Sequence, residues 1–461
     1  MTAVDYKIAG ATPEQQEAVD MLVKQFLLTD SRLGEIIKEF RRRMEDGLAH
    51  DGRVVRMFPS YVTRRPTGSE AGSYYAIDLG GTNLRVLKVT LDGAGGVTTE
   101  HQKFSLTEEA KTKTLFDFIA QSIETFLDDR NLRPTGQDEP ISMGFTFSYP
   151  VQQTSINSGI LSQWTKGLNV PGCVGRDVVR LLQDALLRLG LRVKISALVN
   201  DTVGTLLSAA YKNPAAQMGI IFGTGTNAAY YENIDNIGKW NGPRPESGEM
   251  VVNMEWGAFD SNDFAFLPFT QHDIKLDRKS INPRKQAYEK MISGMYLGEI
   301  ARNVILWLAD QRLMFGGCSS EVLNAMWSID TSYLSNALED TSEDLDEIKC
   351  IIEKTLSIAE TTLVDRKIFR LIAALVGERA ARLSAIGVVA TLGKRPELLK
   401  KAVHIGIDGS MYEFWPNFDK MLSDTVSHFL APEQFANVSF GLAKDGSGVG
   451  AAIIAMLASQ E

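Results

Sequence analysis

Apolar and polar positions along the chain repeat with two different periods, which predict strands in some regions and helices in others. Residues 74–77 form a short apolar run, and Leu87, Val89 and Leu91 alternate with polar neighbours. This two-residue period is typical of a strand with one buried face. Further strands are expected at 141–147 and 193–199, and strand–turn–strand units at 218–231 and 403–414.

Apolar residues at helical spacing dominate the N-terminal region and the second half. Thr12 can cap a helix whose first turn contains Pro13, and a second helix follows from about Ser31. Later helices are expected at 114–129, 176–189, 203–212, 284–313, 345–363, 365–392 and after Gly446. Helices that alternate with strands predict a mixed, partly parallel α/β sheet, in which ligands bind at the carboxyl ends of the strands.

Glycine turns recur at the ends of the predicted strands. The first is Asp78–Asn83 (DLGGTN), the second is Gly223–Asn227 (GTGTN), and a third variant places Asp408-Gly409-Ser410 at its turn. A fourth cluster, Asp445–Gly450, opens an apolar helix. Glycine lets the backbone turn tightly and approach a ligand closely, although Gly-Gly also occurs in ordinary hairpins. The repetition favours a duplicated unit that encloses a polyphosphate.

Composition excludes several classes of protein. A net charge of −9 over 461 residues argues against a nucleic-acid or membrane-surface protein, both of which need a basic face. No apolar run approaches the roughly 20 residues that span a bilayer, so we expect no membrane insertion, and no secretory signal is apparent. Three widely spaced cysteines and five scattered histidines predict neither disulfides nor a metal cluster, and indicate a reducing compartment.

The glycine turns suggest phosphoryl transfer without the usual kinase motifs, because the chain contains neither a P-loop nor the protein-kinase signatures. This chemistry needs donors to the phosphates, Mg²⁺ and one base on the acceptor hydroxyl. Asp78 could hold a hydrated Mg²⁺. Asp201, at a strand end before a helix, could be the base, or it could only cap the helix. Lys166, beside Thr165, could stabilise developing charge or could be a surface lysine.

Several segments together resemble the eukaryotic hexokinase family, collinearly from about residue 20 to the end. They are AIDLGGTNLRV (76–86), GFTFSYP (144–150), QWTKG (163–167), VNDTVGTL (199–206), IIFGTGTNAAY (220–230), EWGAFD (255–260), QAYEKMISGMYLGE (286–299), GIDGSMY (406–412) and DGSGVGAA (445–452). The resemblance implies an α/β protein with the actin-like ATPase (ribonuclease-H-like) fold, two lobes and a central cleft. It also implies transfer of the γ-phosphoryl of Mg-ATP to the 6-hydroxyl of glucose and related hexoses, the first step of glycolysis, in the cytoplasm.

The resemblance assigns roles to individual positions. Asp201 would be the general base, with Lys166 and Arg85 also at the catalytic centre. The sugar would be bound by Ser148, Thr165, Lys166, Asn200, Asp201, Asn227, Glu255 and Glu289. ATP would be bound by Asp78, Leu79, Gly80, Gly81, Thr82, Asn83, Arg85, Thr224, Gly225, Thr341, Gly409, Ser410 and Met411, with Mg²⁺ on Asp78 through water.

The expected lobes are discontinuous in sequence. The small lobe would comprise 59–210 plus 446–461, and the large lobe 1–58 plus 211–445. The chain departs from the family at Arg284 and Lys285, where relatives often carry Gly-Gln, and at Met295, where a lysine is common. Two alternatives stay open: a glucose-restricted glucokinase, and a catalytically weak sugar-sensing regulator on the same fold. The partners would be small molecules, and the oligomeric state is undecided.

Overall fold

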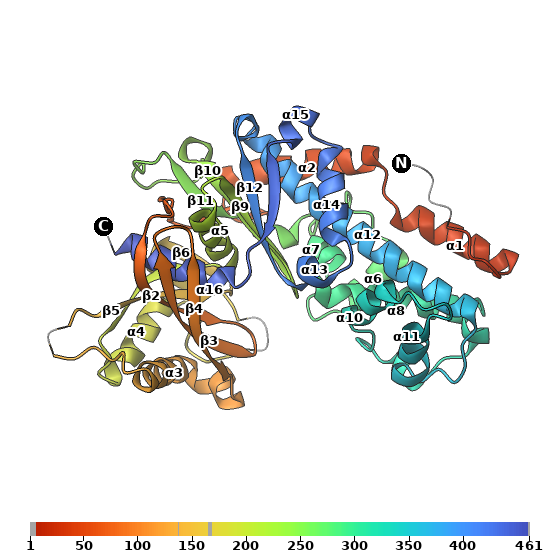
Figure 1. The fold of residues 1–461 in the computed structure, drawn as a ribbon, viewed down its shortest axis with the longest axis horizontal. Helices are drawn as coiled ribbons and strands as arrows, with labels where there is room; N and C mark the ends of the chain where they lie inside the picture. Colours follow the sequence, from red (N-terminus) through yellow and green to blue (C-terminus); the bar gives the residue numbers. More distant parts are fainter. Residues whose placement is uncertain (1–5, 137, 165–167, 460–461) are drawn as a thin grey trace.

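Two β-sheets with helices packed around them form the frame of the protein (Figure 1). The structure is a computed structural model and describes residues 6–136, 138–164 and 168–459. One sheet has five strands in the order β4-β3-β2-β5-β8, and the other has six in the order β1-β11-β10-β9-β12-β13. The prediction of mixed, partly parallel α/β sheets is confirmed.

The five-stranded sheet joins an antiparallel meander to two parallel strands. The meander consists of β2 (Ala71–Leu79), β3 (Asn83–Asp92) and β4 (Val97–Ser105). The strands β5 (Ile141–Phe147) and β8 (Val193–Val199) run parallel to β2. Asp78 pairs with Thr146, and Thr146 pairs with Val199, so these three strands end at the same edge of the sheet.

The six-stranded sheet is built around a second glycine hairpin. Strands β9 (Ala216–Phe222) and β10 (Thr226–Asn233) form this hairpin, and β12 (Val403–Asp408) lies parallel to β9. The sheet is completed by β13 (Val438–Leu442) beside β12, and by β11 (Glu249–Asn253) and the short β1 (Phe58–Pro59) beyond β10. A separate small hairpin contains β6 (Val151–Ser155) and β7 (Ser158–Leu161).

Two helices cross between the sheets. Helix α5 (Asp201–Lys212) packs on β9, and α16 (Gly446–Ala458) packs on β2 and β5 (Figure 1). They touch through glycine, since a Cβ added to Gly450 would lie 1.8 Å from the Gly204 carbonyl oxygen. A Cβ on Gly144 of β5 would likewise lie 2.1 Å from the Ala451 carbonyl oxygen. These small residues let the two helices and the first sheet approach closely.

The remaining helices pack partly on the sheets and partly on one another. At the N-terminus the predicted cap is confirmed, because Thr12 Oγ1 accepts a hydrogen bond from the Gln15 amide at 3.2 Å. The α-helices are α1 (Pro13–Phe26), α2 (Asp30–Ala49), α3 (Leu115–Asp129), α4 (Val178–Arg188), α6 (Gln271–Lys279), α7 (Ala287–Ile292), α8 (Gly294–Asp310), α9 (Glu321–Asn324), α10 (Thr331–Glu339), α11 (Asp346–Cys350), α12 (Leu363–Lys394), α13 (Ser410–Phe414), α14 (Phe418–Ser427) and α15 (Pro432–Phe435). Within the described ranges, no helix combines the length and the apolar character needed to cross a membrane.

Three predicted segments were wrong in their details. The helix expected at 284–313 is two helices, α7 and α8, because Ser293 between them is extended (φ −99°, ψ 151°). The helix expected at 345–363 ends at Thr355, after α11 and a π-helical turn. The unit at 403–414 is a strand followed by the helix α13, not two strands. In each case tertiary contacts outweighed an apolar pattern that fits a longer or different element.

Candidate functional site

The aligned strand ends of the first sheet bring polar residues to one edge. Asp78 closes β2, Ser148 follows β5, and Asn200 follows β8. All three are half-buried, so they can contact a ligand without being fully exposed to water. The edge therefore carries a carboxylate, a hydroxyl and an amide within one surface, as expected for a ligand site in an α/β protein.

The first glycine turn is fixed by hydrogen bonds at both sides. The Gly80 amide donates to the Asn83 carbonyl at 2.9 Å, and the Tyr149 hydroxyl donates to the Gly80 carbonyl at 3.0 Å. The turn forms one wall of an open concavity of about 360 Å³, lined by Asp78, Gly80, Thr82, Asn83, Arg85, His101 and Lys103. His101 and Lys103 had not been predicted, although both lie on β4, where Lys103 pairs with Arg85 of β3 and His101 pairs with Leu87.

Arg85 links the first turn to the start of α16. Its guanidinium lies 2.5 Å from Asp78 Oδ2 and 2.7 Å from Asp445 Oδ1, and the Ser447 hydroxyl donates to Asp78 Oδ2 at 3.0 Å. Burial lowers the pKa of Arg85, but the carboxylates of Asp78 and Asp445 outweigh it, so the net pKa is raised. The positive charge beside the turn is therefore permanent.

A third aspartate, Asp408, ends β12 next to the same charged group. Its carboxylate accepts hydrogen bonds from the amides of Gly409 at 2.7 Å and Gly446 at 3.3 Å. Burial raises the pKa of Asp408, and it outweighs the two amides and Arg85, which lower it. The ends of β2 and β12, one from each sheet, thus meet at the N-terminus of α16.

The second glycine turn, between β9 and β10, is held by the protein around it. The Gly223 amide donates to the Gly225 carbonyl at 3.0 Å, while the first amides of α8 donate to the turn: Gly294 to Gly223 at 2.8 Å and Met295 to Thr224 at 3.2 Å. Beyond the turn, the Thr226 amide donates to Glu289 Oε2 at 2.9 Å. Helices α7 and α8 therefore position this turn.

Asp201 does not cap its helix. The N-cap of α5 is Asn200, whose Oδ1 accepts hydrogen bonds from the amide and hydroxyl of Thr202 at 2.9 and 2.6 Å. Asp201 is the first residue of the helix, half-buried, and its Oδ1 accepts from the Thr202 amide at 2.9 Å. The alternative role that the sequence allowed for Asp201, helix capping, is thus taken by its neighbour.

A polar cluster extends from Asp201 into the second sheet. Asn227 Nδ2 donates to Asn253 Oδ1 at 2.8 Å and lies 3.4 Å from both Glu255 Oε1 and Thr202 Oγ1. Asn253 also donates to Glu255 Oε1 at 3.0 Å. Asn253 had not been predicted; it ends β11, which is apolar between Glu249 and Asn253. Glu255 is in the left-handed region (φ 50°), which turns the chain sharply after β11.

Some predicted residues are placed less directly. Thr165 and Lys166 lie outside the described residues. Thr341 is exposed in the loop after α10, and its assignment to the nucleotide stays a prediction. The contacts of α10 with the turn region come from Thr331, whose hydroxyl donates to the Gly294 carbonyl, and from Ser335, whose hydroxyl donates to the Phe414 carbonyl at 2.9 Å.

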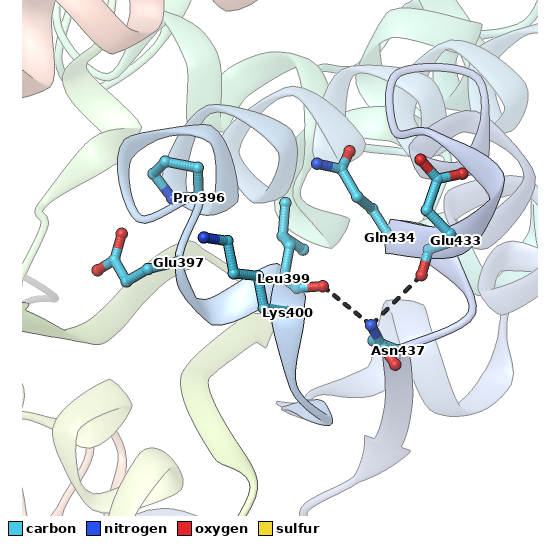
Figure 2. Close-up of a pocket in the computed structure, with 7 residues that line it drawn as sticks. All are labelled: Pro396, Glu397, Leu399, Lys400, Glu433, Gln434 and Asn437. Carbon is cyan, nitrogen blue, oxygen red and sulfur yellow. Dashed lines mark hydrogen bonds between the residues drawn. The ribbon is translucent and has the colours of Figure 1, made fainter.

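Within the described ranges, no group of three histidine, cysteine or acidic side chains could hold a metal ion alone. Mg²⁺ does not need such a group, because it keeps most of its waters and binds through one or two carboxylates plus phosphate oxygens. Asp78 beside the first turn fits that requirement. A larger concavity of about 550 Å³ lies elsewhere, between Leu399 and Glu433, whose carbonyls accept from Asn437 (Figure 2). It contains none of the predicted site residues.

Comparison with known proteins shows the family to which the chain belongs. Two hexokinase family models match residues 18–211 and 217–457. Hexokinase-2 of Candida albicans is 41% identical over 97% of this chain and 93% of that protein, and glucokinase of Aspergillus niger is 39% identical over 95% and 96%. The structure of a Schistosoma mansoni hexokinase complexed with glucose superposes with a TM-score of 0.85 at 36% identity, over 96% of this chain and 99% of that one. The chain therefore belongs to the hexokinase family of sugar kinases.

Proposed function

We propose that this hexokinase transfers the γ-phosphoryl of Mg-ATP to the 6-hydroxyl of glucose and related hexoses, with Asp201 as the general base. One observation supports the role of Asp201 above others. The carboxylate starts α5 at the aligned strand ends of the first sheet, and the adjacent Thr202 contacts Asn227 of the second sheet. A base at this point is adjacent to Asn200 and one residue from the contact with Asn227, two of the proposed sugar residues.

The proposed sugar site is a ring of amides and carboxylates. Asn200, Asn227, Glu255 and Glu289 are half-buried, and hydrogen bonds already connect Asn227 to Glu255. A hexose offers many hydroxyls, each able to donate and accept. A site built from such groups discriminates strongly against analogues that lack a hydroxyl, because buried polar groups would then remain unpaired. Ser148 at the end of β5, with Thr165 and Lys166, completes the proposed set.

The proposed phosphate site lies between the two glycine turns. Residues 78–83 and Arg85 bind the phosphates from the first sheet, while Thr224 and Gly225 bind them from the second, with Gly409, Ser410 and Met411 near the adenosine. Lys103, exposed on β4 in the same concavity, adds a second positive charge. When Mg²⁺ is bound, Asp78 would hold it through water, and the ion would neutralise part of the phosphate charge.

The reaction needs one proton transfer from this chain's residues. Asp201 accepts the proton of the sugar 6-hydroxyl as that oxygen forms its bond to the γ-phosphorus, and the bond from this phosphorus to the leaving ADP oxygen breaks. Arg85 and the turn amides stabilise the charge on the leaving group. Glu255, Asn227 and Glu289 fix the sugar, so that its hydroxyl faces both the base and the phosphate.

The proposed lobes follow from where these groups lie. Ser148 and Asp201 accompany the first sheet, whereas Asn227, Glu255 and Glu289 accompany the second. We propose that a bound sugar draws the small lobe, 59–210 plus 446–461, towards the large lobe, 1–58 plus 211–445, and excludes water from the phosphate.

The three cysteines, 173, 318 and 350, are free, which supports a reducing, cytoplasmic setting.

A coupled assay of ADP release tests this proposal with wild type, Asp201→Asn and a control, Asp177→Asn. Asp177 also lies at a helix N-terminus, where it caps α4, and asparagine preserves capping. We expect sugar-dependent turnover that falls by roughly 10²- to 10⁴-fold in Asp201→Asn and stays near wild type in the control.

The same assay separates the alternative functions. Comparable rates with glucose, fructose and mannose identify a broad hexokinase, whereas turnover with glucose alone identifies a glucokinase. Calorimetric binding of glucose by wild type without sugar-dependent ADP release would contradict the proposed reaction and favour the sensor. Turnover of Asp201→Asn close to that of wild type would contradict the assignment of the base.

A further inference from the structure

A buried ion pair lies directly behind the proposed sugar site. Lys290 Nζ is 2.7 Å from Asp277 Oδ1, and the two side chains are only 5% and 11% exposed. Lys290 Nζ also donates to the Asn282 carbonyl at 2.8 Å, while both oxygens of Asp277 accept from the Arg284 amide at 3.0 and 3.1 Å. The pair therefore connects α6 and α7 to the segment between them, residues 280–286.

That segment has a backbone that needs such support. Arg284 and Gln286 both adopt positive φ (60° and 53°), a conformation that side chains other than glycine disfavour. The Ser280 hydroxyl adds a further bond to the Asp277 carbonyl at 2.8 Å. Without Lys290 and Asp277, Asn282 and Arg284 of this segment lose the hydrogen bonds that hold them. The backbone at Arg284 and Gln286 could then relax from its unfavourable conformation.

The segment leads straight into α7, which carries Glu289. This helix has six residues, too few to be stable by itself, so its position depends on tertiary contacts. Tyr288 anchors one side through the Leu383 carbonyl at 2.7 Å, and Lys290 anchors another. Glu289, between them, presents its carboxylate to the Thr226 amide beside the second glycine turn.

We propose that Asp277 and Lys290 are positioning residues for sugar binding: the pair fixes α7 so that Glu289 faces the sugar. The inference rests on the proposed function of Glu289. A role in stability alone explains the pair poorly, because replacing a buried ion pair by neutral groups is often neutral or stabilising, while its directional bonds specify geometry. Lys290 donates to Asn282 and Asp277 accepts from Arg284, so the pair holds the middle of the 280–286 segment on both sides of Pro283.

The test is the calorimetric Kd for glucose without nucleotide, measured on the full chain with Lys290→Met and with the double variant Asp277→Asn/Lys290→Met. The double variant leaves no buried unpaired charge, so it remains informative if the single variant fails to fold. We expect its Kd and its KM for glucose to rise about tenfold, with kcat within threefold and KM for ATP within twofold. As a control, Glu299→Gln/Arg302→Met neutralises another buried pair, on α8, and should leave glucose binding unchanged.

Each outcome has a defined meaning. A double variant that folds and binds glucose as wild type does would overturn the inference. So would a rise in Kd that the control reproduces, or a kcat that falls in step with thermal stability, because either result indicates a purely structural role. If wild type binds glucose but shows no sugar-dependent turnover, the proposed reaction is contradicted. The ratio of the Kd for glucose between variant and wild type then still tests the positioning role. Wild type that binds no hexose overturns both.

Discussion

The two glycine turns are alike in sequence but differ in why they need glycine. A Cβ added to Gly80 in the first turn would meet nothing closer than the Asn83 carbonyl oxygen at 3.4 Å. A Cβ added to Gly225 in the second would lie 2.7 Å from Glu289 Oε2. Glycine thus leaves space at position 80 of the first turn, while at position 225 of the second it lets Glu289 pack closely. A Cβ added to Gly223, also in the second turn, would meet nothing closer than 3.7 Å.

The aspartates at the two strand ends differ in the same way. Asp78 contacts Arg85 and the Ser447 hydroxyl, both side chains that can rearrange around a ligand. Asp408 accepts its hydrogen bonds from backbone amides, and burial raises its pKa. The first strand end is therefore held by side chains and the second by backbone amides. The two strand ends thus share a sequence motif, but the groups around each aspartate differ.

The largest expected effect concerns Gly409, which directly follows β12 and lies against the second glycine turn. Its φ of 114° is unfavourable for other residues, and a Cβ there would lie 2.3 Å from the Phe222 carbonyl oxygen. We expect Gly409→Ala to lower the free energy of unfolding by about 3–5 kcal/mol, the sum of backbone strain and overpacking. Thermal unfolding followed by circular dichroism should show a midpoint lower by about 3–5 °C, because the unfolding entropy of a 461-residue chain is about 1 kcal/mol/K.

Gly52→Ala is the matched control for this change. Gly52 also has a positive φ, 75°, but nothing lies within 4 Å of an added Cβ. It should therefore lose only about 1 kcal/mol, the cost of the backbone conformation. Equal losses in the two variants would mean that close packing against Phe222 contributes nothing, and the contrast between the two turns would fail.

The second prediction concerns the open turn. Gly80→Ala adds a methyl group where the protein leaves room, so stability should change by less than about 1 kcal/mol. The same methyl group projects where a phosphate is proposed to approach, and we expect KM for ATP to rise about tenfold while KM for glucose stays within twofold. Steady-state kinetics with each substrate varied in turn gives both values. An unchanged KM for ATP would show that the first turn does not approach the nucleotide.

The sequence predicted the elements that depend on local patterns. The capped first helix, the first hairpin and the long helix at 365–392 follow from periodicity and end signals, and the structure confirms them. The break at Ser293 could not be predicted in this way, because 284–313 is apolar at helical spacing throughout. There the amides of Gly294 and Met295 bond to the second turn, a distant partner that a local pattern does not contain.

The candidate site shows the same limit. Asp78, which follows an apolar run, could be found from the pattern alone, whereas Asn253 ends a strand that also begins with a charged residue, Glu249. The choice between Asp201 and Asn200 as the cap of α5 could not, because both residues cap helices well and they are adjacent. The connection of Lys290 to Asp277 joins positions 13 residues apart through a loop whose backbone the sequence does not specify.

The smallest expected effect tests the electrostatic half of the comparison. Burial raises the pKa of Asp408, so the folded state binds this proton more tightly than the unfolded chain does. The resulting stabilisation is fully present below the unfolded pKa of about 4 and is lost as pH rises through the folded pKa. Asp408→Asn cannot ionise. Over a series measured from pH 4 to pH 7, we therefore expect its unfolding midpoint, relative to wild type, to improve as pH rises from 4 and to level off above the folded pKa.

The difference between the two midpoints is the informative quantity, because asparagine also weakens the bond to the Gly446 amide at every pH. That loss changes the difference in midpoint by the same amount at every pH, so it does not produce a pH dependence. Asp184→Asn, on the exposed face of α4, corrects for the general effect of removing a negative charge from a protein of net charge −9. A flat difference across this range would mean that burial does not disfavour the charged form of Asp408, and the electrostatic half of the comparison would fail.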